Sequence, residues 1–92
     1  MELRNIKFKT HNPIWCEEAM KKLFENGVEW IDGNGGKTQI KLTDNTPYLY
    51  VNGQLELARG FEVSSFKEHK NIEVDIWEII NVNNDELTYE IY

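Results

Sequence analysis

The segment from residue 12 to residue 27 constrains the fold most, because it carries a full set of helix boundary signals. Asn12 is a favourable N-cap, Pro13 suits the first helical position, and Gly27 follows the last turn. Between them, apolar side chains recur at helical spacing: Trp15, Ala19, Met20, Leu23 and Phe24. The sequence therefore predicts one well-defined amphipathic helix.

The rest of the chain alternates between apolar and polar residues, which predicts strands. Strands are expected within residues 1–10, 28–31, 39–43, 48–51, 54–57, 72–76 and 87–91. Asn52-Gly53 is the preferred dipeptide of a two-residue type I′ turn and would join two of them. The glycine-rich stretch 32–38 would form another hairpin turn, and Ser65 with Glu68 fits a capping box over a short helical turn.

These elements predict an α+β fold in which one main helix packs on a twisted, mainly antiparallel sheet of about six or seven strands. Ninety-two residues form a single domain, 1–92, with one modest core. No stretch has the length and hydropathy of a transmembrane helix or the apolar region of a signal peptide. An untargeted cytoplasmic protein is expected.

Residues that could carry chemistry are few. Cys16 lies at helical spacing with the apolar stripe and is interpreted as a small core residue, while His11 and His69 lack partners at metal-ligand spacing. The stretch DGNGGKT lacks the first glycine and the following helix of a phosphate-binding loop, and it also lacks the glycine and glutamate of a calcium loop. Ser64 and Ser65 precede His69 without an orienting acid. No enzyme activity, metal or cofactor is expected.

Charge is distributed unevenly along the chain. Residues 1–46 hold seven acidic and seven basic side chains, whereas residues 47–92 hold nine acidic and three basic ones, so the second half carries the whole net charge of −6. The basic residues of the first half are interpreted as a solvated face, and no direct nucleic-acid binding is expected. The second half supplies a predicted acidic strip: Glu62, Glu68, Glu73, Asp75, Glu78, Asp85, Glu86 and Glu90.

Two interpretations of the acidic strip remain open. It could keep the protein soluble and its edge strands unpaired, or it could imitate a nucleic-acid backbone and occupy the DNA-binding site of another protein. Two aromatic residues, Trp77 and Tyr92, share strand parity with these carboxylates and are candidate anchors for a partner or a second copy. A bulge that turns Trp77 inward is the alternative.

The order of three segments resembles a layout found in small early proteins of T-even-type bacteriophages. Trp15 is followed by KLFENGVEW (residues 22–30) and then by PYLYV (residues 47–51), so a helix that ends in glycine leads into a Trp-containing strand. In size, pI and acidic carboxyl end, the chain is most similar to the Arn-type anti-restriction proteins of that group. That resemblance covers about residues 6–76.

The resemblance implies a DNA-mimic inhibitor whose partner is a host DNA-binding protein, the restriction nuclease McrBC or the nucleoid protein H-NS. A homodimer would join two strips. The rival hypotheses are a phage inhibitor that binds through a sheet edge or an aromatic patch, and a module that sequesters a small ligand or nucleotide. In both, the acidic face would serve only solubility.

Overall fold

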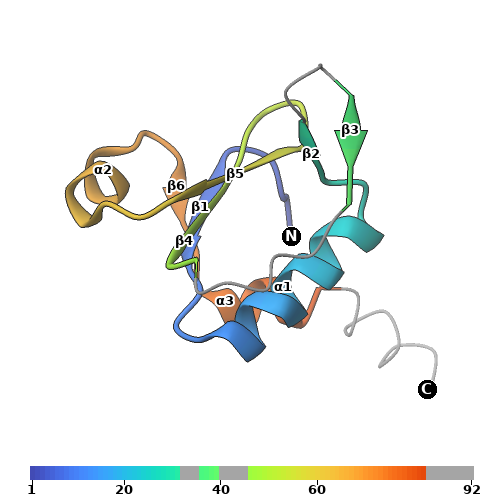
Figure 1. Cartoon of the computed structure of the whole chain (residues 1–92), viewed down its shortest axis with the longest axis horizontal. Helices are drawn as coiled ribbons and strands as arrows, with labels where there is room; N and C mark the ends of the chain where they lie inside the picture. Colours follow the sequence, from blue (N-terminus) through green and yellow to red (C-terminus); the bar gives the residue numbers. More distant parts are fainter. Residues whose placement is uncertain (32–35, 40–45, 83–92) are drawn as a thin grey trace.

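The computed structural model describes residues 1–31, 36–39 and 46–82 and has an α+β fold (Figure 1). Within these ranges six strands form one mixed sheet in the order β3-β2-β5-β4-β1-β6, and three helices accompany it. The strands are β1 (Ile6–Lys9), β2 (Glu29–Ile31), β3 (Lys37–Thr38), β4 (Tyr48–Val51), β5 (Glu56–Gly60) and β6 (Ile72–Glu73). The helices are α1 (Pro13–Glu25), α2 (Val63–Glu68) and α3 (Ile76–Ile80).

The strand directions explain the strand order. β4 pairs antiparallel with both β1 and β5, and β2 pairs parallel with β5. β1 and β2 therefore run in the same direction, and α1 is the crossover between them, while the β4–β5 hairpin fills the space between the two strands. β3 and β6 form the edges, antiparallel to β2 and parallel to β1. The predicted α+β class is confirmed, and two parallel ladders make the sheet mixed.

The main helix forms as predicted. The Asn12 side chain accepts a hydrogen bond from the Trp15 N–H at 2.8 Å, Pro13 is the first helical residue, and Gly27 takes a left-handed φ of +88° after the helix. Four residues of α1 face the core and are buried: Cys16, Ala19, Met20 and Leu23. The prediction that Cys16 is a core residue is confirmed.

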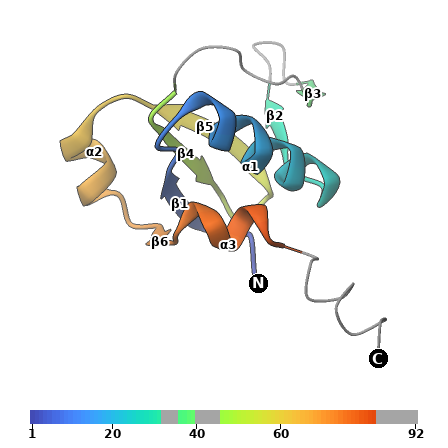
Figure 2. The ribbon, with the colours of Figure 1, turned by 90° about the horizontal axis from the view of Figure 1, so that it is seen from below.

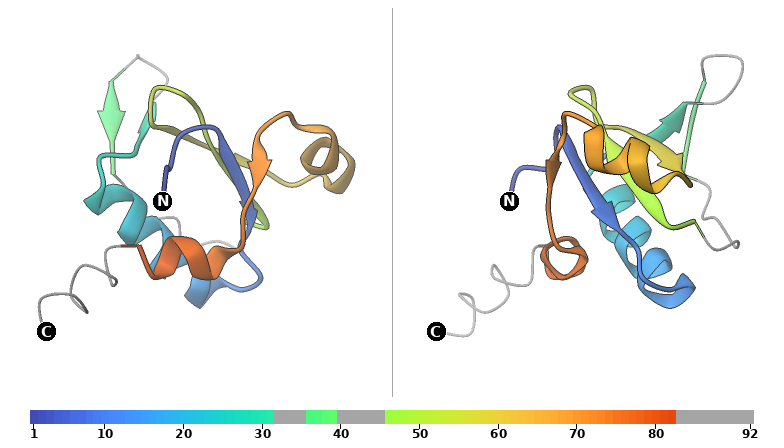
Figure 3. Two further views of the ribbon diagram at one scale, coloured as in Figure 1. Left: turned by 180° about the vertical axis from the view of Figure 1, so that it is seen from behind. Right: turned by 90° about the vertical axis from the view of Figure 1, so that its left-hand side faces the viewer.

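The core lies between one face of the sheet and helices α1 and α3, which share that face (Figure 2). Its largest fully buried side chains on these elements include Phe8, Met20, Leu23, Leu49 and Ile79. Helix α2 lies against the opposite face of the sheet, over β1 and β4 (Figure 3). There Phe66 stacks on Tyr48 with ring centroids 4.5 Å apart. The rest of that face carries no helix among the described residues.

The predicted strand 72–76 is wrong beyond Glu73. β6 ends there, and Asp75 begins α3 as its N-cap. The Asp75 carboxylate accepts from the Trp77 N–H at 2.8 Å, and the Glu78 carboxylate accepts from the Asp75 N–H at 3.1 Å. This capping box satisfies the free donors at the start of α3, and the helix then buries Ile76 and Ile79.

Two predicted turns also differ in detail. The β4–β5 hairpin is not a type I′ turn at Asn52-Gly53, because neither residue has the left-handed φ that such a turn needs. Leu55 takes that conformation instead (φ +60°), and its N–H donates to the Asn52 carbonyl at 3.2 Å. Helix α2 begins at Val63 with Glu62 as N-cap, so Ser65 lies inside the helix and is not its cap.

Other predictions fall outside the described residues. These are the glycine-rich turn at 32–35, most of the strand 39–43, and the carboxyl-terminal hairpin with Asp85, Glu86, Glu90 and Tyr92. Across the described ranges, none of the helices is long and apolar enough to cross a membrane.

Candidate functional site

Five carboxylates of the predicted acidic strip lie in the described residues, and all five are exposed. They are Glu62, Glu68, Glu73, Asp75 and Glu78. The segment 62–78 also carries Lys67 and Lys70, so five acidic and two basic side chains give it a net charge of −3. The structure therefore presents an acidic surface along α2, β6 and the start of α3.

The carboxylates do not form one continuous row. Glu73 and Asp75 line a hollow of about 370 Å³ together with Lys9 and His11, so a lysine interrupts the acidic surface there. Asp75 and Glu78 are held together by the α3 capping box. Glu62 and Glu68 lie at the two ends of α2, which at 1.5 Å per residue separates them by about 9 Å along the helix. Two groups result, one on α2 and one at the β6–α3 junction.

Three of these carboxylates are free to meet a partner. Within the described ranges, the carboxylates of Glu62, Glu68 and Glu73 make no hydrogen bond or ion pair. Asp75 and Glu78 already accept backbone hydrogen bonds in α3. The free carboxylates can therefore bind a cation without loss of an internal contact.

Trp77 lies on helix α3, so its predicted strand parity with Glu73 and Asp75 does not apply. Its ring is tilted against Trp15 of α1 with centroids 4.6 Å apart, and 47% of the residue stays exposed. The His11 ring packs edge-on against the Trp15 ring, with the two centroids 5.7 Å apart. In the sequence, Trp77 nevertheless lies between Asp75 and Glu78, the two carboxylates of the capping box, at the β6–α3 junction.

Lys7 departs from the predicted solvated basic face. It is 5% exposed, and its ammonium donates to the carbonyl oxygens of Phe66, Lys67 and His69 at the end of α2. The same ammonium lies 4.8 Å from the centre of the Phe66 ring. Lys7 thus fixes α2 on the sheet and is withdrawn from the basic surface. Strand alternation correctly pointed it to the face opposite the core but gave no sign that a helix covers it there.

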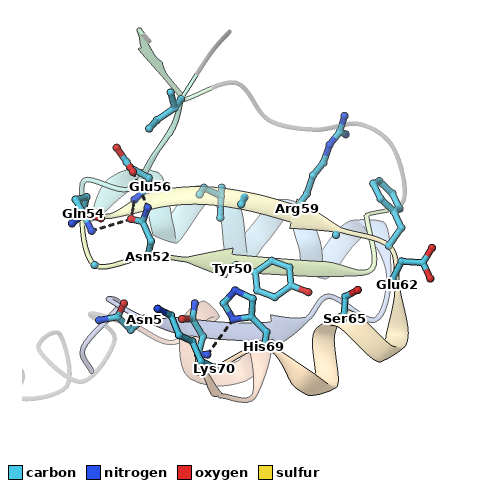
Figure 4. A pocket seen from close by; sticks show the side chains of 17 residues that line it. Asn5, Tyr50, Asn52, Gln54, Glu56, Arg59, Glu62, Ser65, His69 and Lys70 are labelled. Atoms are coloured by element: carbon cyan, nitrogen blue, oxygen red, sulfur yellow. Dashed lines mark hydrogen bonds between the residues drawn. The ribbon is translucent and has the colours of Figure 1, made fainter. Parts of the chain in front are cut away.

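A second feature, which the sequence did not predict, is a hollow on the open face of the sheet (Figure 4). It has a volume of about 890 Å³ and runs along β5 between the β4–β5 turn and the start of α2. Its lining includes Ala58 and Gly60 of β5, the rings of Tyr50 and His69, and the apolar side chains of Phe61 and Ile31. Its size is typical of small-molecule sites.

Tyr50 and His69 are two of the aromatic side chains that line this hollow. The Tyr50 and His69 rings are 4.6 Å apart, and burial, followed by the neighbouring Tyr48, raises the pKa of the Tyr50 phenol above its ordinary value of 10.0. The Asn71 N–H donates to His69 Nδ1 at 3.1 Å, so Nε2 carries the proton when the ring is neutral. Among the described residues no carboxylate is hydrogen-bonded to His69, so within this part of the chain Ser65 and His69 do not form the arrangement of a catalytic triad.

Metal binding finds no support in the described part of the chain, where no three His, Cys, Asp or Glu side chains could hold an ion together. Comparison with family models, with curated proteins and with solved structures found no match to this chain. Any function must therefore be inferred from the charges, contacts and hollows described above.

Proposed function

We propose that this protein is a phage anti-defence protein that works without catalysis, as an acidic DNA mimic in the host cytoplasm. It would occupy the DNA-binding site of a host protein, with the nuclease McrBC or the nucleoid protein H-NS as the partner that the resemblance suggests. The observation that carries the proposal is the segment 62–78, where all five carboxylates are exposed. A basic groove built for phosphates attracts such a surface.

Burial of Lys7 strengthens the acidic character of this surface. Its ammonium is bound by three carbonyl oxygens at the carboxyl end of α2 and its C-cap, so it does not neutralise the carboxylates of the neighbouring segment from outside. Glu68 lies among these carbonyls in the sequence and Glu73 follows them, and both remain exposed. Lys7 therefore holds α2 in place and does not pair with the carboxylates, which remain accessible to solvent or to a partner.

An aromatic anchor stands beside the charges. Trp77 is half exposed and packed against Trp15, so its position is fixed before any partner arrives. Tryptophan is enriched among the residues that dominate binding energy at interfaces, and it also stacks well with arginine. Glu73, Asp75 and Glu78 near Trp77 could bind the same arginine-rich surface.

The number of charges limits what one copy can imitate. Duplex DNA carries one charge per about 1.7 Å of axis, so five carboxylates match only a short stretch of it. Two copies would provide a longer match, and a homodimer is therefore part of the proposal.

A competition experiment tests the proposal. A fluorescein-labelled duplex is bound to purified McrBC or H-NS, and the protein is added while anisotropy is measured. The wild type is expected to displace the duplex, and the double variant E68Q/E73Q to require about tenfold more protein, because each exposed charge pair contributes a few-fold in affinity. Asp75 and Glu78 are left intact because they cap α3.

The matched control is E18Q/E25Q, which removes the same charge from exposed positions of α1. It should displace the duplex as the wild type does. Equal loss in both double variants would show that only net charge matters, and no loss in E68Q/E73Q would contradict the assignment of this surface.

A second candidate is an inhibitor that binds its host target chiefly through the Trp15–Trp77 pair. The exposure of Trp77 favours it. The same titration separates the two functions, because apolar binding survives added salt while displacement through carboxylates weakens. Loss of binding in W77A without loss in E68Q/E73Q would favour this second candidate.

A further inference from the structure

The hollow on the open face of the sheet is distinct from the acidic segment for most of its length. Of the five exposed carboxylates of that segment only Glu62 lines the hollow, although Ser65, His69, Lys70 and Asn71 of the same segment also line it. Its floor is low because β5 places small residues there: Ala58 is exposed to the hollow, and Gly60 has no side chain. A Cβ on Gly60 would lie 2.9 Å from the Tyr50 ring, so the tyrosine occupies the space over the glycine. The open part of the floor is therefore Ala58, where a flat group can approach β5 beside the Tyr50 ring.

The sides of the hollow suit an aromatic ligand. Tyr50 and His69 contribute rings to its lining, and Phe61 and Ile31, 56% and 47% exposed, contribute apolar surface. Such exposed apolar side chains around a concave surface are typical of binding sites. Planar rings stack favourably on aromatic side chains whatever their substituents.

Hydrogen-bond donors without internal partners line the same wall. Within the described ranges, the hydroxyls of Tyr50 and Ser65, the His69 Nε2 and the Lys70 ammonium make no hydrogen bond. In Figure 4 the Tyr50 hydroxyl is directed to the Ser65 side of the hollow, and His69 stands beside the tyrosine ring. Hydroxyls can also accept, but the imidazole N–H and the ammonium only donate. The wall therefore favours a ligand rich in acceptors.

This wall is held in place by contacts behind it. Lys7 fixes the end of α2, and the Asn71 amide donates to the carbonyls of Ile6 and Val51 at 3.0 and 3.1 Å. The Asn71 N–H then fixes the His69 ring through Nδ1. A site that is rigid before binding loses less entropy when a ligand enters.

We infer that this hollow binds a planar heteroaromatic ligand that carries hydrogen-bond acceptors, the chemical class of nucleobases and nucleotides. The ring would lie over Ala58 beside Tyr50, with its acceptors toward Ser65, His69 and Lys70. The inference does not depend on the proposed function, because the acidic junction and Trp77 take no part in it.

Titration followed by ¹H–¹⁵N NMR tests it. The uniformly labelled full chain is titrated with AMP, GMP, CMP and UMP, and in parallel with adenosine and with inorganic phosphate. At least one nucleotide is expected to give saturable shifts with a Kd below about 1 mM, confined to β4, β5 and residues 65–71. Comparing the shifts caused by adenosine with those caused by inorganic phosphate distinguishes recognition of the ring from recognition of the anion.

Variants locate the site. A58F fills the floor from an exposed position and should abolish the shifts, while S65A removes one donor without filling space and should weaken binding several-fold. I14F places the same phenylalanine side chain at an exposed position of α1, outside the hollow, and should leave binding unchanged. The spectrum of each variant reports whether it is folded.

Three results would overturn the inference. These are the absence of saturable shifts with every nucleotide and with adenosine, identical shifts with phosphate alone, and binding that is unaffected in both A58F and S65A.

Discussion

At the scale of single residues, Lys7 shows how a local pattern can be right while its consequence is missed. Alternation along β1 places Lys7 on the face opposite the core, in register with Tyr50 of β4. A lysine in that position normally reaches solvent, but α2 covers it and supplies three carbonyl oxygens at its carboxyl end. The ammonium also meets the negative end of the helix dipole there.

Replacement of this lysine should therefore destabilise the protein. We expect K7M to lower the free energy of unfolding by about 2 kcal/mol, because hydrogen bonds to charged groups are lost and the carbonyls of α2 lose their donor. The measurement is urea denaturation, with amide exchange in α2 as a local readout. K9M changes an exposed lysine on the same strand and should stay within about 0.5 kcal/mol of the wild type. Equal effects of the two variants would contradict the role given to Lys7.

Single residues with local signals were predictable, and those that depend on distant segments were not. Asn12, Pro13 and Gly27 act within one helix, so their roles follow from sequence alone. The free donors of Tyr50, Ser65 and His69 meet only after α2 folds back over β4. No spacing along the chain indicates that meeting, which is why the hollow was not foreseen.

At the scale of elements, the segment 72–80 shows two local signals in competition. Ile72, Val74 and Ile76 alternate with acidic residues and predict a strand. Asp75 and Glu78, at capping-box spacing, predict a helix start instead, and that second signal prevailed because the helix buries both Ile76 and Ile79. A strand would have placed one of these two isoleucines on the solvent side.

The contribution of the Asp75 N-cap of α3 to the free energy of unfolding should be measurable. D75A removes the acceptor for the Trp77 N–H, and we expect it to lower stability by about 1 kcal/mol, as is typical of lost N-caps. E73A removes an exposed carboxylate without a described partner two residues earlier and should change stability much less. Urea denaturation gives both values, and Cα chemical shifts of residues 76–80 report the helix. The prediction fails if E73A is as destabilising as D75A.

At the scale of the whole molecule, strand periodicity predicted the layers but not the connections. Alternation shows that a strand has one buried face, yet it does not say which strand is its neighbour. The parallel β2–β5 ladder arises because α1 carries the chain across the sheet and the β4–β5 hairpin inserts between β1 and β2. The same insertion leaves β5 with small residues on an open face, which creates the hollow.

The net charge is also a property of the whole chain, and salt should change stability and binding in opposite directions. With a net charge of −6, carboxylates repel one another in the folded protein. The Debye length falls from about 30 Å at 0.01 M salt to about 8 Å at 0.15 M, so added salt screens this repulsion. We expect the melting temperature to rise by about 4 °C over that range, which corresponds to about 1 kcal/mol for a domain of this size.

Displacement of labelled DNA from the host protein should weaken over the same range, because attraction between the carboxylates and a basic groove is screened as well. Calorimetry and anisotropy on the same samples measure the two effects. In E68Q/E73Q the net charge becomes −6 + 2 = −4, so both salt effects should shrink together. A melting temperature that falls with salt would mean that attractive charge pairs outweigh repulsion in the fold, and the acidic surface would then be internally compensated and not available to a partner.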